Sequence, residues 1–307
     1  ELSIETVQEF SSAVEQLVKK NVDSKTGIFL SSGIDSAIVA SYLPKGTKAY
    51  TLKCDLGEID ETKIAEQYAR TYDLDWKMII VTWKDYQKYL PTLMISQGMP
   101  IHSIGPQIYK GLIEAKNDGL NSIVTGFGAD DRFGGLNRIL SRDWHPEEFM
   151  RWYTYVDPQK ALKKPVSMMN TIFKFVKEDG FIDVFRFISN GPLGEEGDTS
   201  FNNPFNLTGI KHISIYTKIG LNKPLDIQRI RHGEPKYLVR ELFKLRYPNF
   251  NIPDKIPMPR AVNQWLADWD GPKRSEFIPN CHIGMTGEQK WLLFCLEKFL
   301  DMIEPEM

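Results

Sequence analysis

The 307-residue chain has few cysteines and no long apolar run. Its three cysteines, Cys54, Cys281 and Cys295, lie far apart and form no CxxC pair. This spacing argues against a disulfide framework or a cysteine zinc site and is typical of reduced thiols in a cytoplasmic protein. No apolar segment reaches the roughly 18–20 residues that span a bilayer. We therefore expect a cytoplasmic location and no membrane partner.

A strong charge of either sign is also missing. The 38 basic and 40 acidic residues give a net charge of -2, which provides no electrostatic footprint for nucleic acid. The five histidines show no metal-ligand spacing. What the chain does have is length and 42% hydrophobic residues, enough for a large core. These properties favour a globular protein that acts on small molecules, with no nucleic-acid partner expected.

Strand and helix patterns alternate in the first half of the chain. Apolar residues at helical or strand spacing recur there, separated by turn residues. The predicted strands cover residues 27–30, 48–53, 76–81 and 121–125, and the predicted helices cover residues 3–20, 37–43, 61–72, 84–96 and 106–116. This order predicts an α/β fold, a parallel sheet with helices on both faces.

The pattern changes after about residue 140 to aromatic-rich helical stretches with no clear strand. Residues 190–209 are rich in Gly, Pro and Asn and predict a long surface loop. Residues 210–307 return to helical spacing, which ends in a helix over residues 290–302. We expect a core at residues 1–140 and a mostly helical region at 141–307 that completes the same site, within one domain overall.

The junction after the first core strand, residues 31–36, has the sequence SSGIDS. A buried strand that turns through serines and glycine into a helix presents backbone N–H groups and a positive helix end, which suit an anion. The hydroxyls of Ser31, Ser32 and Ser36 add donors, and Gly33 permits close approach of the backbone. Asp35 would repel a phosphate unless a divalent cation bridges the two. The lysine of a Walker loop is absent.

A second glycine-rich segment, residues 125–135, follows the fourth strand with the sequence TGFGADDRFGG. Its glycines permit tight turns near a ligand, and its paired carboxylates, Asp130 and Asp131, can hold a cation. Asp35 and Asp130 both follow strand ends, which meet at one edge of a parallel sheet. One Mg²⁺ could be shared between them.

The two segments resemble motifs of a known superfamily. Residues 31–36 resemble the pyrophosphate loop SGGxDS of the N-type ATP pyrophosphatases, with Ser32 where glycine is usual, a change that a negative φ would tolerate. Residues 125–135 resemble the SGEGxDExFGG motif of asparagine synthetase and the TGYGxD form of β-lactam synthetase. The likeness continues through residues 224–226, 233–240 and 252–255, with Trp265 beyond, so that it covers roughly residues 22–270.

The resemblance implies an adenine nucleotide alpha-hydrolase-like fold and an AMP-forming amide ligase. In such enzymes ATP and Mg²⁺ activate a carboxylate as an acyl-adenylate, and an amine or ammonia then attacks the acyl carbon. It implies that Asp35 and Asp130 hold Mg²⁺, and that Asp131 belongs to the catalytic site with Lys236 and Lys255, which match lysines that meet the phosphates. Nucleotide contacts fall by the same likeness on Ser31, Ser32, Gly33 and Ser36 and, around the adenosine, on Phe29, Leu30, Lys53, Thr125 and Gly126.

Phe127 departs from the pattern, because asparagine synthetase has Glu and β-lactam synthetase a catalytic Tyr at this position. Phenylalanine cannot accept or deliver a proton. Three explanations stay open: another residue acts as the base, the amine needs none, or Phe127 shapes a pocket for an apolar or aromatic substrate. The nearest titratable residues downstream are His145, Glu147, Glu148, Tyr153 and Tyr155.

The sequence begins at Glu1, and we expect no N-terminal glutaminase with a first-residue cysteine, as found in asparagine synthetases, unless such a domain was removed. We expect either that the nucleophile is free ammonia or another amine, or that a glutaminase partner was lost or is a separate subunit. Two other functions remain: a tRNA-modifying or nucleotide-amidating pyrophosphatase, and a non-catalytic ATP-binding subunit. The sequence names neither the carboxylate nor the amine.

Overall fold

The computed structural model describes residues 2–57, 60–254 and 256–304 of the chain. Seven strands are described: β1 (Leu2–Ile4), β2 (Thr26–Phe29), β3 (Lys48–Cys54), β4 (Asp75–Val81), β5 (Ser122–Thr125), β6 (Lys211–Ser214) and β7 (Ile219–Leu221). The helices of the first half are α1 (Val7–Asn21), α2 (Ile34–Ala40), α3 (Thr62–Thr71), α4 (Trp83–Gln97), α5 (Gly105–Asn117), α6 (Ala129–Phe133) and α7 (Asn137–Leu140). Those of the second half are α8 (Pro146–Tyr153), α9 (Pro158–Ala161), α10 (Met169–Phe173), α11 (Val184–Asn190), α12 (Pro192–Thr208), η1 (Tyr216–Lys218), α13 (Ile227–Arg231), α14 (Tyr237–Arg246), α15 (Val262–Trp265) and α16 (Gly287–Ile303).

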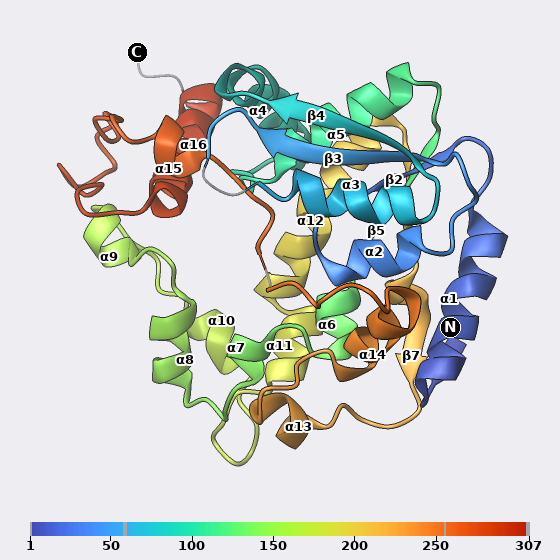
Figure 1. The fold of residues 1–307 in the computed structure, drawn as a ribbon. Coiled ribbons are helices and arrows are strands. Elements are labelled where there is room, and N and C mark those ends of the chain that lie inside the picture. Colours follow the sequence, from blue (N-terminus) through green and yellow to red (C-terminus); the bar gives the residue numbers. More distant parts are fainter. Residues whose placement is uncertain (1, 58–59, 255, 305–307) are drawn as a thin grey trace.

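The central sheet has five parallel strands in the order β4-β3-β2-β5-β6 (Figure 1). Strands β2 and β5 are neighbours in register, with Ile28 opposite Val124. The loops after both strands therefore leave the same edge of the sheet side by side. The predicted α/β fold, a parallel sheet with helices on both faces and a helical C-terminal region, is confirmed.

Helices cover both faces of this sheet. On one face α1, α2, α3 and α14 pack apolar side chains against residues such as Ile28 and Val124. On the other face α5 and α12 pack against the opposite side chains, including Leu52 and Ile123. Because side chains alternate along a strand, each face receives its own set of buried residues.

Two segments of the second half differ from the sequence prediction. The prediction of no strand after residue 140 is wrong, because β6 forms one edge of the sheet and β7 pairs with β1. Both strands are short, four and three residues, which leaves no periodic signal to detect. The two regions of the chain thus share one sheet.

Residues 190–209 are not a surface loop. Most of them form α12, a 17-residue helix that begins after Gly191 and ends at Gly209. Its buried side chains include Phe205 and Asn203, and the Asn203 amide donates to the carbonyl oxygen of Leu93 at 2.9 Å. Packing against α4 and α5 outweighs the poor helix propensity of the Gly, Pro and Asn residues.

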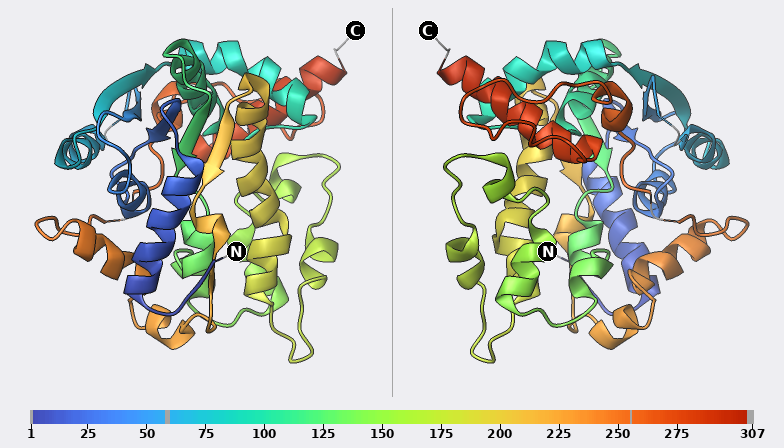
Figure 2. Two further views of the ribbon diagram at one scale, coloured as in Figure 1. Left: turned by 90° about the vertical axis from the view of Figure 1, so that its right-hand side faces the viewer. Right: turned by 90° about the vertical axis from the view of Figure 1, so that its left-hand side faces the viewer.

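The remaining helices lie around this core. Helices α4, α15 and α16 share an aromatic cluster that includes Trp83, Trp265 and Trp291. Helices α7, α8, α10, α11 and α13 share a separate apolar cluster, and α7, α8, α10 and α11 lie near the lower end of α12 in Figures 1 and 2. Among the described residues no helix combines the length and apolar character that a membrane span requires.

Candidate functional site

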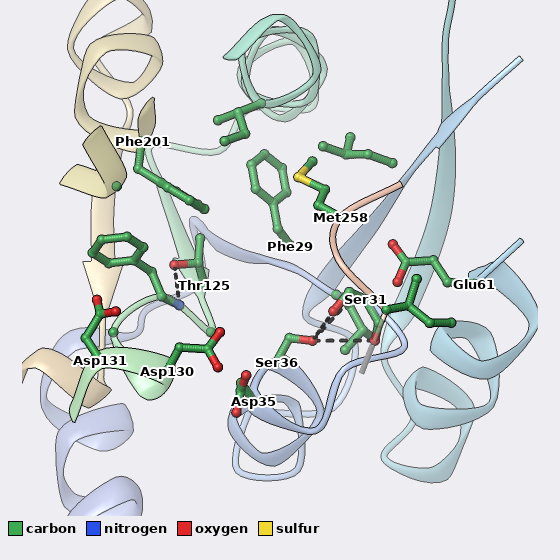
Figure 3. A pocket seen from close by; sticks show the side chains of 18 of the residues that line it. Phe29, Ser31, Asp35, Ser36, Glu61, Thr125, Asp130, Asp131, Phe201 and Met258 are labelled. Atoms are coloured by element: carbon green, nitrogen blue, oxygen red, sulfur yellow. Dashed lines mark hydrogen bonds between the residues drawn. The ribbon is translucent and has the colours of Figure 1, made fainter. Parts of the chain in front are cut away.

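A cavity of about 370 Å³ opens at the edge of the sheet where β2, β3 and β5 end (Figure 3). It brings together nine of the residues that the sequence singled out: Phe29, Leu30, Ser31, Asp35, Ser36, Thr125, Gly126, Asp130 and Asp131. The parallel order of β2 and β5 explains why residues almost a hundred positions apart line one space.

Four other predicted residues do not line this cavity. Ser32 and Gly33 lie in the loop behind its wall, and the Lys53 ammonium forms an ion pair with Asp60 at 2.7 Å. Lys236 is buried, with 7% of its surface exposed, and is not part of the lining. The fifth, Lys255, lies outside the described residues.

Ser31 and Ser36, two of the three serines in residues 31–36, bond to one another. The Ser36 hydroxyl lies 3.0 Å from the Ser31 hydroxyl and accepts from the Ser31 backbone N–H, while the Ser31 hydroxyl accepts from the N–H of Gly33 at 3.1 Å. The expectation of open backbone donors is therefore wrong for Ser31 and Gly33, because these N–H groups find acceptors within the loop. An anion would have to exchange with these serine oxygens.

Ser32 takes the place of the usual glycine without a positive φ, since the only described non-glycine residues with positive φ are Asp73, Lys236 and Asn280. Its N–H and hydroxyl both donate to Glu61, at 3.1 and 2.9 Å. Glu61 is 6% exposed and lines the cavity. Burial raises the pKa of its carboxyl, although the hydrogen bonds from Ser32 oppose that shift. The sequence analysis missed Glu61, because nothing in its position before α3 signals a contact with a loop 29 residues earlier.

Lys236 joins the two glycine–aspartate segments. Its ammonium donates to Oδ2 of Asp35 at 2.6 Å and lies 2.8 Å from Oδ1 of Asp130. Burial lowers the pKa of Lys236, but the two carboxylates outweigh it and the pKa is raised. Asp35 of α2 and Asp130 of α6 thus converge on the Lys236 ammonium.

Two glycines make this convergence sterically feasible. A Cβ at Gly126 would come within 2.9 Å of the Asp35 Cβ and of the Ser36 backbone N. A Cβ at Gly135 would lie 2.0 Å from Asp130 Oδ1 and from the Lys236 side chain. Only glycine permits contacts as close as these. The glycines of the 125–135 segment therefore let the β5 end approach α2 and the lysine.

The backbone of Lys236 has φ +52° and ψ 37°, a left-handed conformation at the start of α14. Residues with a Cβ rarely adopt it, and it costs of the order of 1–3 kcal/mol. The bonds to Asp35 and Asp130 help to hold the residue in this conformation and direct its ammonium between the two acids.

The donor set fits a divalent cation that arrives with a phosphate ligand. Among the described residues no group of three or more His, Cys, Asp or Glu is arranged to hold a metal alone. Mg²⁺ in nucleotide sites needs less, because one or two carboxylates suffice when phosphates and waters supply the other ligands. Asp35 and Asp130 already share one cation. The pair suits such a metal.

An aromatic cluster forms the far wall of the cavity. The Phe127 ring packs against Phe201 of α12 with centroids 4.8 Å apart and against His212 of β6 at 5.7 Å. The His212 Nε2 atom lies 2.8 Å from Oγ1 of Thr125. Burial lowers the pKa of His212 to about 4, so the ring is neutral near pH 7. The sequence analysis missed Phe201 and His212, because it assigned their segments to a loop and to helix.

None of the residues considered as a replacement base lines this cavity: His145, Glu147, Glu148, Tyr153 and Tyr155 are all absent from its lining. Glu148 instead pairs with Arg142 at 2.7 Å, and the Tyr153 ring packs on Phe149 and Phe187. Burial raises the pKa of Tyr153. The structure does not bring these residues to Phe127.

Solved structures that are similar to this chain include two that align with low sequence identity and a low TM-score. An NMN synthetase from Francisella tularensis aligns over 84% of this chain and 99% of its own with 15% identity and a TM-score of 0.31. An NH3-dependent NAD synthetase from Campylobacter jejuni aligns over 42% of this chain and 58% of its own with 18% identity and a TM-score of 0.29. Likenesses this weak carry no argument about the site.

Sequence comparisons are more specific. A putative glutamine-hydrolysing asparagine synthetase from Methanocaldococcus jannaschii is 26% identical over 144 residues, which is 45% of this chain and 27% of that protein. The chain thus spans about a quarter of the length of this relative. The asparagine synthase family matches residues 8–183, more than half of the chain and both glycine–aspartate segments. The chain therefore belongs to the asparagine synthase family.

Proposed function

We propose that this chain is an ATP-dependent, AMP-forming amide ligase. It adenylates a substrate carboxylate, releases pyrophosphate and transfers the acyl group to an amine or to ammonia. Membership of the asparagine synthase family supports an ATP-using synthetase. The identity of the reaction rests on the site, because the chain spans only part of its relative.

One observation carries the proposal: Asp35 and Asp130 meet at the buried Lys236 ammonium beside a cavity large enough for a nucleotide. The ionisable carboxylates that line the cavity, Asp35, Glu61, Asp130 and Asp131, would repel a bare triphosphate. A nucleotide therefore has to bring a divalent cation with it. Bound Mg²⁺ would neutralise phosphate charge as pyrophosphate leaves.

The remaining roles follow from position. The loop residues Ser31, Ser32, Gly33 and Ser36 are proposed to hold the β- and γ-phosphates, by exchange of their present acceptors for phosphate oxygens. Phe29, Leu30, Thr125 and Gly126 line the cavity where the adenosine would lie, and Lys53 is the least supported contact, because it pairs with Asp60. Asp131 lines the same cavity.

Lys236 and Lys255 are proposed to stabilise the departing pyrophosphate. Lys236 is 2.6 Å from Asp35 and is already next to the proposed metal position. Fixed cations in a water-poor site stabilise such charge strongly. Regions 1–140 and 141–307 are proposed to act as one synthetase unit, because β6 and Lys236 of the second region complete the sheet and the site of the first.

The test is to identify the products of ATP. Purified protein is incubated with Mg²⁺, α-labelled ATP and a panel of carboxylic acids with ammonium, glutamine or amino acids as nitrogen sources. We expect AMP and pyrophosphate in equal amounts, dependent on the acid. Activity with ammonium but not glutamine would indicate free ammonia or a separate glutaminase subunit. Formation of ADP would overturn the proposal, and tight ATP binding without turnover of any acid would favour a non-catalytic subunit.

A further inference from the structure

The α12 wall of the cavity presents one face of a helix. Leu193, Gly197 and Phe201 are spaced by four residues, and all three line the cavity. Side chains four apart lie above one another on a helix, so these residues form one continuous strip. In Figure 3 Phe201 lies on the side of Asp131, away from Glu61 and Met258. The strip therefore lines the side of the cavity that Asp131 shares, opposite Glu61 and Met258.

Phe127 extends this strip toward the end of β5. Its backbone N–H donates to the Thr125 hydroxyl at 3.3 Å, and its carbonyl oxygen accepts from the Ser214 hydroxyl at 2.7 Å. The ring lies against Phe201 and His212. Both backbone and ring are thus held by neighbours, and Phe127 presents a fixed apolar surface at the end of β5.

Gly197 keeps the space in front of Phe127 open. A Cβ built on this glycine would lie 3.9 Å from the Phe127 ring, and no other atom outside its own helix and its chain neighbours lies within 4 Å of it. An alanine would therefore fit, but a longer side chain would enter the cavity between Leu193 and Phe201. The helix gains nothing from glycine here, which costs about 0.5–1 kcal/mol relative to alanine.

The charged side chains in the described lining of the cavity all have the same sign. Every charged side chain among the described lining residues is acidic: Asp35, Glu61, Asp130 and Asp131, and no described Lys, Arg or His lines the cavity. A carboxylate that reacts with ATP would meet Mg²⁺ and the lysines proposed beside the phosphates. A second carboxylate on the same acid, placed beside the α12 strip, would contact only carboxylates and aromatic rings. Burial of an unpaired charge in such surroundings is costly.

We infer that the acid adenylated at this site carries an apolar group, of aromatic size, and no second carboxylate. The group lies against Phe127, Phe201 and Leu193 in the space that Gly197 leaves open. Apolar area removed from water contributes about 25 cal/mol per Å², so that a phenyl-sized group gains several-fold to several-hundred-fold in affinity over a small one. This inference rests on the proposed ligase reaction and names the class of its substrate.

The experiment compares matched acids with and without a second charge. Pyrophosphate release is measured with 3-phenylpropanoate and L-phenylalanine against succinate and L-aspartate, and the same acids are tested for protection against thermal unfolding without ATP. We expect the aromatic acids to have a kcat/KM at least about tenfold higher, as expected from the discrimination that apolar pockets achieve. We also expect only the aromatic acids to raise the melting temperature.

The variant Gly197→Leu fills the space without loss of helix propensity. It should raise the KM for aromatic acids by at least about tenfold and abolish their thermal protection, with little change for acetate. Phe173→Ala is the matched control, because Phe173 is an exposed ring outside the cavity lining. It should behave like the wild type.

Preference for succinate or aspartate, or equal binding of aromatic acids by wild type and Gly197→Leu, would overturn the inference. Failure of the proposed reaction has a different signature, since no acid would release pyrophosphate while the thermal arm would still report which acids bind. Binding of neither class would overturn the inference as well.

Discussion

The cavity has two contrasting parts. Its floor is the set of acidic residues Asp35, Glu61, Asp130 and Asp131, and its wall is formed by Leu193, Gly197 and Phe201 of α12 together with Phe127. Asp35, Asp130 and Asp131 of the floor lie in the first turns of α2 and α6, the helices that follow β2 and β5, and the parallel sheet fixes their position. The wall is a strip of apolar side chains on α12 together with Phe127, held by packing. This difference separates two kinds of function: loss of the floor should remove the chemistry, whereas changes in the wall should alter which acid is used.

The largest effect is expected from the acids of the floor. Asp35→Ala or Asp130→Ala should each lower pyrophosphate release by about 10³-fold or more, because the proposed metal loses one of its two protein carboxylates. The matched control is Asp143→Ala, since Asp143 is an exposed residue that pairs with Arg231 away from the cavity. Steady-state rates at saturating ATP give the comparison. Retention of activity within tenfold in either variant would remove that residue from the metal site.

Lys255 is the next test of the floor. Lys255→Met should cost about 10²–10³ in kcat, by analogy with removal of one donor to transition-state charge. The KM for ATP should change less, because the charge on pyrophosphate develops as it leaves. Lys244→Met, on the exposed side of α14, serves as the control. Unchanged kinetics in the Lys255 variant would exclude it from the mechanism.

Removal of the Lys236 ammonium should lower the free energy of unfolding as well as the reaction rate. Lys236→Met leaves Asp35 and Asp130 close together without their shared ammonium, and the free energy of unfolding should fall by about 3 kcal/mol. Mg²⁺ at millimolar concentration should restore part of this loss, since a metal can take the place of the ammonium. Urea unfolding with and without Mg²⁺ measures both effects.

The surface pair Lys298–Asp301 provides the control for that experiment, because Lys298→Met should cost less than about 1 kcal/mol. A Lys236 variant as stable as the wild type, or one that Mg²⁺ does not rescue, would contradict the shared-cation arrangement.

Four of the five strands of the central sheet and most residues of the floor could be predicted from the sequence for a physical reason. Strands β2, β3 and β5 are largely buried runs bounded by turn residues, and helices α3, α4 and α5 have buried apolar residues at helical spacing. Motif residues at strand ends then fall together by topology alone. Gly126 and Gly135 belong to the same local signal, because their close contacts leave no other residue type.

The wall could not be predicted in the same way. Helix α12 contains two glycines and two prolines and is stabilised by contacts with α4 and α5 that are remote in sequence. Strand β6 is a four-residue edge strand. The contact between Glu61 and Ser32 also depends on tertiary structure alone. Packing of this kind leaves no periodic trace in the sequence, which is why Phe201, His212 and Glu61 were missed.

The smallest expected effect concerns His212, which supports the wall. Burial lowers its pKa to about 4 from an ordinary value of 6.5. Since the unfolded chain binds this proton near pH 6.5 and the folded chain only near pH 4, the contribution of His212 to stability is full above pH 6.5 and is lost as the pH falls toward 4. His212→Gln keeps a polar partner for Thr125 but does not titrate. Between pH 7 and pH 5 the wild type should therefore lose about 2 kcal/mol more than the variant in urea unfolding.

His102 provides the contrast that links this titration to the wall. Burial, with the nearby Arg260 charge, lowers its pKa to about 4 as well, but His102 lies outside the cavity lining. His102→Gln should therefore reduce the acid sensitivity by a similar amount and leave the preference among acids unchanged. His212→Gln should do both, because the ring that supports Phe127 and Phe201 is gone. Equal acid preference in the two variants would separate His212 from the wall, and an unchanged pH dependence in His212→Gln would show that the ring is not buried in its neutral form.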